Sequence, residues 1–340
     1  MEILDILQNL TACTGTPGAE KAAVEVAEKY LCEYGKTYTD KLGNLICEIN
    51  GTGKGILLDA HIDRVGLIVT AITPEGFLHV GFCGGIDERT LCAQQVTVHS
   101  KKEIKGVIIS TPPHLKADGD ERQTPKIDEI LVDIGMNYEQ ASKSVQLGDR
   151  ITVDSQFLYL AGDRVAAAGF DDRCGMAAII YALDILKTRG CDRKITVVFS
   201  TREEVGGSGA KVASYNADAE EFVAVDVSFA KTPDSSAEKC GILGNGPMIG
   251  YAASLDKEVS DKLKALAIEK RIPYQLEIMG GRTGTNADSM STSGSGYRSG
   301  LVSVPLRYMH TSVEVISVND IKNTGWLLAE YICDGGVLNA

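Results

Sequence analysis

The chain has 340 residues, of which 44% are hydrophobic and 24% are charged, and its formal net charge is −12. This composition is ordinary for a globular protein, and the length suits one large domain or two medium ones. Because binding to a nucleic acid backbone needs a basic surface, the acidic balance argues against nucleic acid as a partner. No apolar run approaches the roughly 20 residues that cross a bilayer, so we expect no membrane association.

The nine cysteines are scattered along the chain and form no CxxC pair. This distribution predicts free thiols in a reducing compartment, in place of a disulfide framework or a zinc ribbon. The first ten residues, MEILDILQNL, lack the basic start of a secretory signal peptide. We therefore expect a cytoplasmic protein.

The chain begins with an α/β pattern and then changes texture. Segment 17–35 has apolar residues at helical spacing, and the apolar runs 43–49 and 53–60 predict strands. From 67 to 162 the chain consists mainly of short β runs split by Gly, Pro and charged turns. These runs span 66–72, 77–82, 94–100, 104–110, 129–135 and 150–157, with one short helical pattern at 137–145.

Strands and helices alternate again after this region. The pattern predicts helices at 174–190, 256–271 and 319–336, and strands at 194–200, 221–228 and 300–306. Such alternation is typical of a mostly parallel central sheet with helices covering both faces. The expected fold class is therefore α/β, with a small barrel-like β domain at 67–162 inserted into a domain that comprises 1–66 and 163–340.

Polar side chains gather where the predicted strands end. Five segments that are far apart in the sequence each supply carboxylate or imidazole groups at such a point. These groups are His61 with Asp63, Asp171 with Asp172, Glu203 with Glu204, Asp226, and His310. Because ligands of open α/β sheets bind outside the carboxyl ends of the strands, we expect the five segments to meet at one edge of the sheet.

The residue types at this edge are those of a two-metal centre. Two histidines and the carboxylates of Asp171, Glu204 and Asp226 would hold two divalent ions, and one glutamate would remain spare. Without cations, carboxylates crowded at one edge would repel one another. The mixture of carboxylate and imidazole, with no thiolate, suits zinc, cobalt or manganese.

Each of these motifs has a simpler interpretation when it is taken alone. A His-x-Asp pair usually satisfies itself in a turn, and a Glu-Glu pair after a strand is usually solvated. The Asp-Asp-Arg run at 171–173 would serve as a helix N-cap, and His310 would be a core histidine. The metal interpretation depends on all of these motifs occurring in one chain.

Five motifs in this order resemble the M42 family of metallo-aminopeptidases, which includes the tetrahedral, glutamyl and deblocking aminopeptidases. The motifs are AHIDRVG, GFDDRCG, TREEVGGSGA, AVDVSFA and RYMHTSVEVIS. The resemblance runs from near residue 5 to about residue 333 and includes the position of the β insertion. It implies an enzyme that removes N-terminal residues from short peptides with two divalent metal ions per subunit.

The resemblance also implies which residues bind the metals. His61 and Asp226 would bind one ion. Glu204 and His310 would bind the other, and Asp171 would bridge the two. In such proteins the bridging aspartate precedes a cis peptide bond, which here would join Asp171 to Asp172.

Two further residues would act beside the ligands. Glu203 would be the general base, taking a proton from the attacking water and later giving one to the leaving amine. Asp63 would accept a hydrogen bond from His61 and fix the tautomer of that ring. Arg64 departs from the family pattern, which usually has an acidic residue there, as does the segment NADSM at 286–290.

The β insertion mediates assembly in the family, so the resemblance implies a homo-oligomer between a dimer and a dodecamer. From the sequence alone the insertion could equally be a lid. Two other functions stay open at this point: a related co-catalytic hydrolase of N-acyl amino acids, and a non-catalytic assembly protein. An endoglucanase is not expected, because glycoside hydrolysis uses two carboxylates that flank a sugar and no metal.

Overall fold

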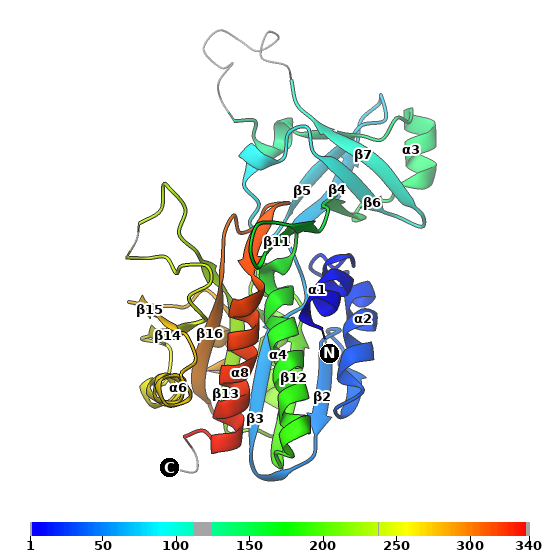
Figure 1. Cartoon of the computed structure of the whole chain (residues 1–340). Helices are drawn as coiled ribbons and strands as arrows, with labels where there is room; N and C mark the ends of the chain where they lie inside the picture. The colour runs from blue at the N-terminus through cyan, green and yellow to red at the C-terminus, as the bar shows by residue number, and fades with distance from the viewer. Residues whose placement is uncertain (1, 112–123, 237, 338–340) are drawn as a thin grey trace.

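The computed structural model describes residues 2–111, 124–236 and 238–337. A large α/β layer structure carries a smaller β barrel at one end (Figure 1). Within the described residues, the main sheet has eight strands. In spatial order they are β1 (Lys36–Thr39), β2 (Leu45–Ile49), β12 (Arg193–Ser200), β3 (Thr52–His61), β13 (Glu221–Phe229), β16 (Arg298–Leu306), β14 (Met248–Ala252) and β15 (Gln275–Met279).

The centre of this sheet is parallel. Strands β12, β3, β13 and β16 run in the same direction, so their carboxyl ends lie at one edge. Strand β2 joins β12 antiparallel on one side, and β14 joins β16 antiparallel on the other. The central strands are almost continuous apolar runs because both of their faces are covered.

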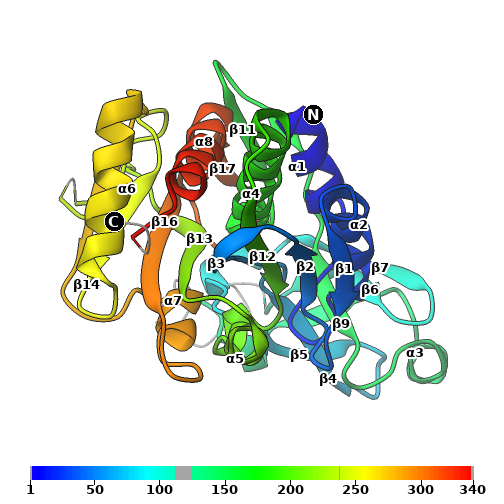
Figure 2. The same ribbon diagram turned by 90° about the horizontal axis from the view of Figure 1, so that it is seen from below.

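Helices cover both faces of the sheet (Figure 2). One face is covered by α1 (Ile3–Thr11), α2 (Lys21–Leu31), α4 (Phe170–Arg189), α6 (Lys257–Lys270) and α8 (Val318–Asp334). The other face is covered by α5 (Ser208–Asn216) and α7 (Asn286–Met290). The α/β fold class expected from the sequence is therefore confirmed.

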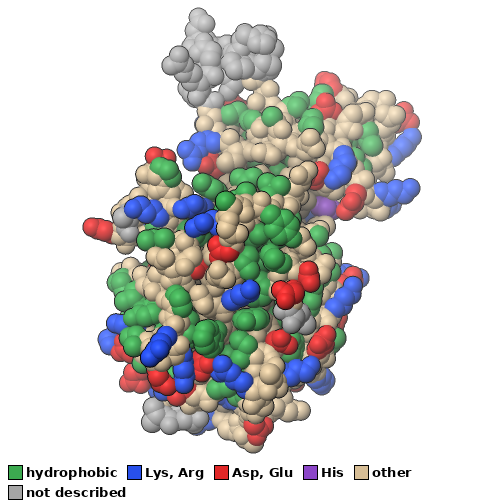
Figure 3. Space-filling model, viewed as in Figure 1, with side chains coloured by type: hydrophobic (Ala, Val, Ile, Leu, Met, Phe, Trp, Pro, Cys, Tyr) green, Lys and Arg blue, Asp and Glu red, His purple; other side chains and the backbone are tan. Residues whose placement is uncertain are grey.

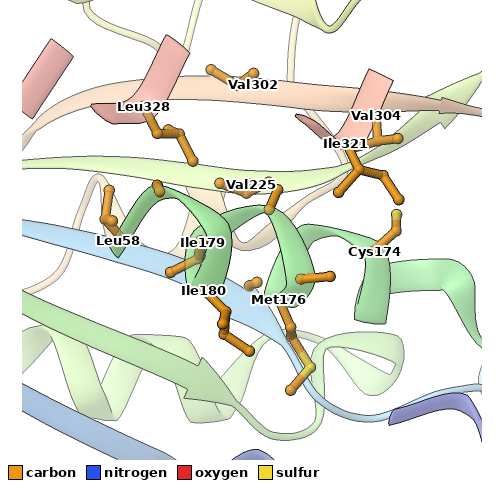
Figure 4. Packing of buried hydrophobic residues seen from close by; sticks show 14 of the residues in the cluster. Leu58, Cys174, Met176, Ile179, Ile180, Val225, Val302, Val304, Ile321 and Leu328 are labelled. Carbon is orange, nitrogen blue, oxygen red and sulfur yellow. The ribbon is translucent and has the colours of Figure 1, made fainter. Parts of the chain in front are cut away.

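Helix α4 is the centre of the larger hydrophobic core. Its Met176, Ile179 and Ile180 are fully buried among side chains of the sheet and of α8, such as Val225 and Leu328 (Figure 4). This explains why residues 174–190 are apolar on more than one face: the helix lies between the sheet and its neighbouring helices.

The barrel closes in the order β4 (Gly66–Ile72), β5 (Leu78–Cys83), β8 (Leu131–Asp133), β7 (Glu103–Ile109), β6 (Gln95–His99) and β9 (Arg150–Val153). It has a core of its own, which includes Leu67, Val96 and Ile151. Helix α3 (Tyr138–Ser144) packs beside it. Residues 112–123 of the expected insertion lie outside the described residues.

A small sheet connects the barrel to the larger domain. It consists of β10 (Leu158–Tyr159), β11 (Arg164–Ala167) and β17 (Glu314–Ser317). Strand β11 leads directly into α4, and β17 leads into α8. Two site residues lie next to these strands in the sequence: Asp171 follows β11, and His310 precedes β17.

Within the described residues, no helix is both long enough and apolar enough to cross a bilayer. On the face drawn in Figure 3, Lys and Arg side chains are scattered among acidic ones.

The packing of α8 against α4 yields a stability prediction. A β-carbon on Gly325 would lie 2.6 Å from the Ala178 carbonyl oxygen and 2.9 Å from Cδ1 of Tyr181. Because overpacking a core costs about 1–3 kcal/mol, Gly325→Val should lower the free energy of unfolding in urea by that amount. Lys322→Ala, on the exposed side of the same helix, should change it by less than about 0.5 kcal/mol. Equal effects of the two substitutions would contradict the close contact.

Candidate active site

The carboxyl edge of the parallel strands brings together the five side chains that the sequence pattern grouped as metal ligands. His61 is the last residue of β3, and Asp226 lies within β13. Asp171 lies at the start of α4, and Glu204 lies in η4 (Glu203–Val205), the short turn after β12. His310 comes from the segment between β16 and β17. The expected meeting of five distant segments at one edge is therefore observed.

The five side chains form two groups that share one residue. In the first group, Nε2 of His61 is 2.9 Å from Oδ1 of Asp171 and 4.0 Å from Oδ1 of Asp226. In the second, Nε2 of His310 is 3.2 Å from Oδ2 of Asp171 and 3.2 Å from Oε2 of Glu204. The ligand atoms of each group lie within 4.8 Å of one another. Asp171 thus offers one oxygen to each group.

The backbone around Asp171 is not helical. Its peptide bond to Asp172 is cis, which confirms the expectation from the resemblance. Asp172 does not join either group. Its carboxylate accepts hydrogen bonds from the main-chain N–H groups of His61 (3.3 Å) and Gly175 (3.2 Å), so it ties the end of β3 to α4.

Burial shapes the electrostatics of the carboxylates. Burial raises the pKa of Glu204 and of Asp226 well above the usual range, and the neighbouring charge of Asp171 raises both further. Burial also opposes ionisation of Asp171, but hydrogen bonds with His310 and His61 hold its pKa below the usual range. In the absence of a counter-charge, burial and the neighbouring Asp171 therefore favour the neutral forms of Glu204 and Asp226.

The residues present fit a pair of divalent cations. Among the described residues, the ion pairs of Asp171, Glu204 and Asp226 involve histidines and no Lys or Arg. Oε1 of Glu204 is buried and has no hydrogen-bond partner. Cations would satisfy this oxygen and offset the crowded carboxylates, and a donor set of imidazole nitrogen and carboxylate oxygen is one that zinc, cobalt and manganese accept.

Asp63 acts in the structure mainly through the turn that carries the two glutamates. Nδ1 of His61 is 2.9 Å from the main-chain oxygen of Asp63 but 3.6 Å from its carboxylate. The carboxylate instead accepts hydrogen bonds from the main-chain N–H groups of Glu203 (3.0 Å) and Glu204 (3.2 Å). His61 therefore meets the main-chain oxygen of Asp63, whereas the sequence predicted a hydrogen bond to its carboxylate.

Glu314 is a positioning residue that sequence reasoning missed. It is buried at the start of β17, and its carboxylate accepts hydrogen bonds from the main-chain N–H groups of Asp171 (3.2 Å) and His310 (3.0 Å). A ligand from each group is therefore held by one side chain. A glutamate within the short apolar run VEVIS is the signal that could have identified it.

The barrel also reaches the site. The main-chain oxygen of Gly85, in the segment after β5, lies 2.6 Å from Nδ1 of His310. Next to it, a β-carbon on Gly84 would lie 3.2 Å from Cβ of Glu204. The two glycines let the barrel backbone approach both residues closely, and the Gly85 carbonyl orients the His310 ring.

Arg64 is buried and belongs to neither ligand group. Its Nη2 donates a hydrogen bond to the main-chain oxygen of Val153, 3.2 Å away in the barrel. Its methylene carbons lie beneath Gly169, where a β-carbon would be 3.0 Å from Cδ of Arg64. Arg64 therefore connects the two parts of the chain.

A cavity of about 520 Å³ opens beside the two groups. All five ligand-type residues line it, and so does Glu203, which belongs to neither group. Burial raises the pKa of Glu203. The cavity is large enough for the end of a peptide, and Glu203 places a carboxyl group at its wall outside both ligand groups.

Comparison with known proteins identifies the class. The family model described as M42 glutamyl aminopeptidase matches residues 43–327. The lysyl aminopeptidase of Pyrococcus furiosus is 34% identical over 292 residues, which cover 84% of this chain and 83% of that protein. These matches define the protein as a peptidase, a hydrolase of peptide bonds.

Solved structures agree with this assignment. The TET aminopeptidase of a marine sediment Thaumarchaeota archaeon has a TM-score of 0.94 at 27% identity, covering 99% of this chain and 97% of its own. The TET1 peptidase of Pyrococcus horikoshii has a TM-score of 0.86 at 30% identity, covering 97% and 99%. The chain belongs to the M42 family.

The contacts of Asp63 predict a specific effect on the site. Asp63→Asn replaces one acceptor of the Glu203–Glu204 turn with a donor, so we expect metal affinity to fall about 10–100-fold in a competition assay with a chelating dye. The control is Asp320→Asn, because buried Asp320 likewise accepts two main-chain N–H groups, from Gly244 and Gly246 at 2.7 Å each. The control should lose stability but keep its metal affinity. Unchanged affinity in Asp63→Asn would contradict this role.

Proposed function

We propose that this protein is a dinuclear metal-dependent aminopeptidase that removes N-terminal residues from short peptides. The observation that carries the proposal is the pair of ligand groups that share Asp171, one oxygen to each group. Membership of the M42 family supports the same reaction class. The adjoining cavity supplies the space for a peptide end.

The proposed ligands follow the two groups. His61 and Asp226 hold one ion, Glu204 and His310 hold the other, and Asp171 serves both. When bound, two divalent ions supply a Lewis acid for the scissile carbonyl and a water of lowered pKa. Zinc, cobalt and manganese all suit this mixture of nitrogen and oxygen donors.

Glu203 is the proposed general base. It lies in the same turn as Glu204 but outside both ligand groups, so its carboxylate stays free to take a proton from water and return it to the leaving amine. Asp63 fixes the main chain of this turn and thereby the position of both glutamates. One turn thus supplies a ligand and a base.

We also propose that the chain forms homo-oligomers through the inserted β domain at 67–162. The support is the TET1 peptidase of Pyrococcus horikoshii, which can assemble into a tetrahedron or a large octahedral shell. Small peptides would be the natural substrates of a particle that encloses its active sites.

We further propose a cytoplasmic location. All nine cysteines are free in the structure, which suits a reducing cytoplasm.

Paired glutamine variants test the division of labour in this turn. Glu203→Gln should keep both metal ions and lose at least about 100-fold in kcat on aminoacyl substrates, because only the proton acceptor is removed. Glu204→Gln should lose metal, because it removes a charged ligand. Metal analysis of the purified proteins and a panel of aminoacyl amides would measure both effects.

Two outcomes would contradict the proposal. Metal loss in Glu203→Gln with retention in Glu204→Gln would mean that the roles are reversed. A metal-loaded parent protein that releases no N-terminal residue from any free-amine peptide would exclude an aminopeptidase. Hydrolysis of N-acyl amino acids by the same protein would then favour an acyl amino acid hydrolase.

A further inference from the structure

The floor of the cavity continues from the metal-ligand groups toward a second carboxylate. Ser303 of β16 is the register partner of Asp226, and Ser228 lies two residues after Asp226 on the same face of β13. Both hydroxyl groups donate hydrogen bonds to the carboxylate of Glu277 on β15, and the distance from Ser303 is 3.0 Å. Glu277, Ser228 and Ser303 all line the cavity.

Glu277 has hydrogen-bond capacity left over. Its carboxylate has four lone-pair positions, and the two hydroxyl donors occupy two of them. No Lys, Arg or His forms an ion pair with it within the described parts of the chain. Burial raises the pKa of Glu277, although the two serine hydroxyls oppose this shift. A carboxylate in this setting is stabilised by an incoming cation.

Apart from the metal-ligand groups, Glu203 and Glu277, the charged side chains that line the cavity lie at its exposed rim. Glu238, Lys239 and Arg282 line the same cavity, and all three are exposed. Water and salt screen exposed charges strongly, whereas a largely buried charge is screened much less. Beyond the metal-ligand groups and Glu203, Glu277 is therefore the least screened charge among the described residues that line the cavity.

The remaining walls suit a long aliphatic stem. Met248 and Leu301 are buried beside Ser303, and Met279 and Met309 line the same cavity. Flexible methionine side chains adapt to a stem of varying length, and lysine and arginine stems commonly lie along apolar surface with the charged end at a polar partner.

We propose that Glu277 is a specificity-determining residue that selects peptides whose N-terminal side chain is cationic, lysine or arginine. This rests on the proposed aminopeptidase function: the peptide end lies at the metal-ligand groups, and its side chain extends over Ser303 to Glu277. Asp226 and Ser303 face each other on adjacent strands, about 4.8 Å apart, and the Ser303 hydroxyl lies 3.0 Å from the Glu277 carboxylate. A long cationic side chain can follow this path to Glu277, whereas a short side chain ends before it.

The first test is a substrate panel on the unmodified, metal-loaded protein. Lysyl and arginyl amides should give a kcat/KM at least about tenfold higher than leucyl and glutamyl amides. A preference for leucyl amides would overturn the proposal. A preference for glutamyl amides would also overturn it, and would assign selection to Lys239 or Arg282.

The second test compares matched variants. Glu277→Gln should lower kcat/KM for lysyl amides at least about tenfold, chiefly by raising KM, and leave the leucyl rate nearly unchanged. Glu277→Asp keeps the charge and should restore part of the lysyl preference. Glu238→Gln, which removes an exposed rim carboxylate, is the control and should keep the preference. Equal losses on all substrates in Glu277→Gln would mean a structural role and overturn the proposal.

A binding measurement separates this proposal from the proposed function. Calorimetry with lysinol and leucinol, which carry a free amine and no scissile amide, on the metal-loaded protein should show tighter binding of lysinol, and Glu277→Gln should abolish this difference. If the protein hydrolyses no free-amine substrate but still shows this difference, the reaction is misassigned and the cation pocket stands. Equal binding of the two amino alcohols would overturn the pocket itself.

Discussion

A buried carboxylate that serves two ligand groups is the constraint on which this structure depends. Asp171 is almost wholly inaccessible to water, yet it faces His61 and Asp226 on one side and His310 and Glu204 on the other. Burial of charge is costly unless each charge finds a partner. Three carboxylates crowded around two imidazoles form a donor set that fits divalent cations, so the geometry and the electrostatics of the site support the same proposal.

The rest of the architecture holds these groups in place. The parallel strands deliver His61 and Asp226 to one edge of the sheet, and the small sheet beside α4 delivers Asp171. Three positioning contacts then come from different parts of the chain: Asp63 fixes the glutamate turn, Glu314 fixes two ligand backbones, and Gly85 orients a histidine ring. Because Gly85 belongs to the barrel segment, the barrel takes a direct part in positioning the His310 ring.

Much of the fold and several site residues could be predicted from local sequence, because apolar periodicity indicates which residues are buried and the ends of apolar runs indicate where strands end. The positions of His61 and Asp226 followed from that logic. Helix α1 was not predicted, although Ile3, Ile6, Leu7 and Leu10 have helical spacing. Edge strand β15 was missed because Glu277 separates Leu276 from Ile278 and leaves no continuous apolar run. The roles of Glu314 and Glu277 depend on contacts across the sheet, which no local pattern contains.

The most direct test of the account is anomalous diffraction from crystals of the zinc-loaded protein. We expect two anomalous peaks in each subunit, about 3.5–4 Å apart, with one oxygen of Asp171 directed at each peak. A single peak, or two peaks that Asp171 does not join, would contradict the central claim that this carboxylate is shared by a pair of ions.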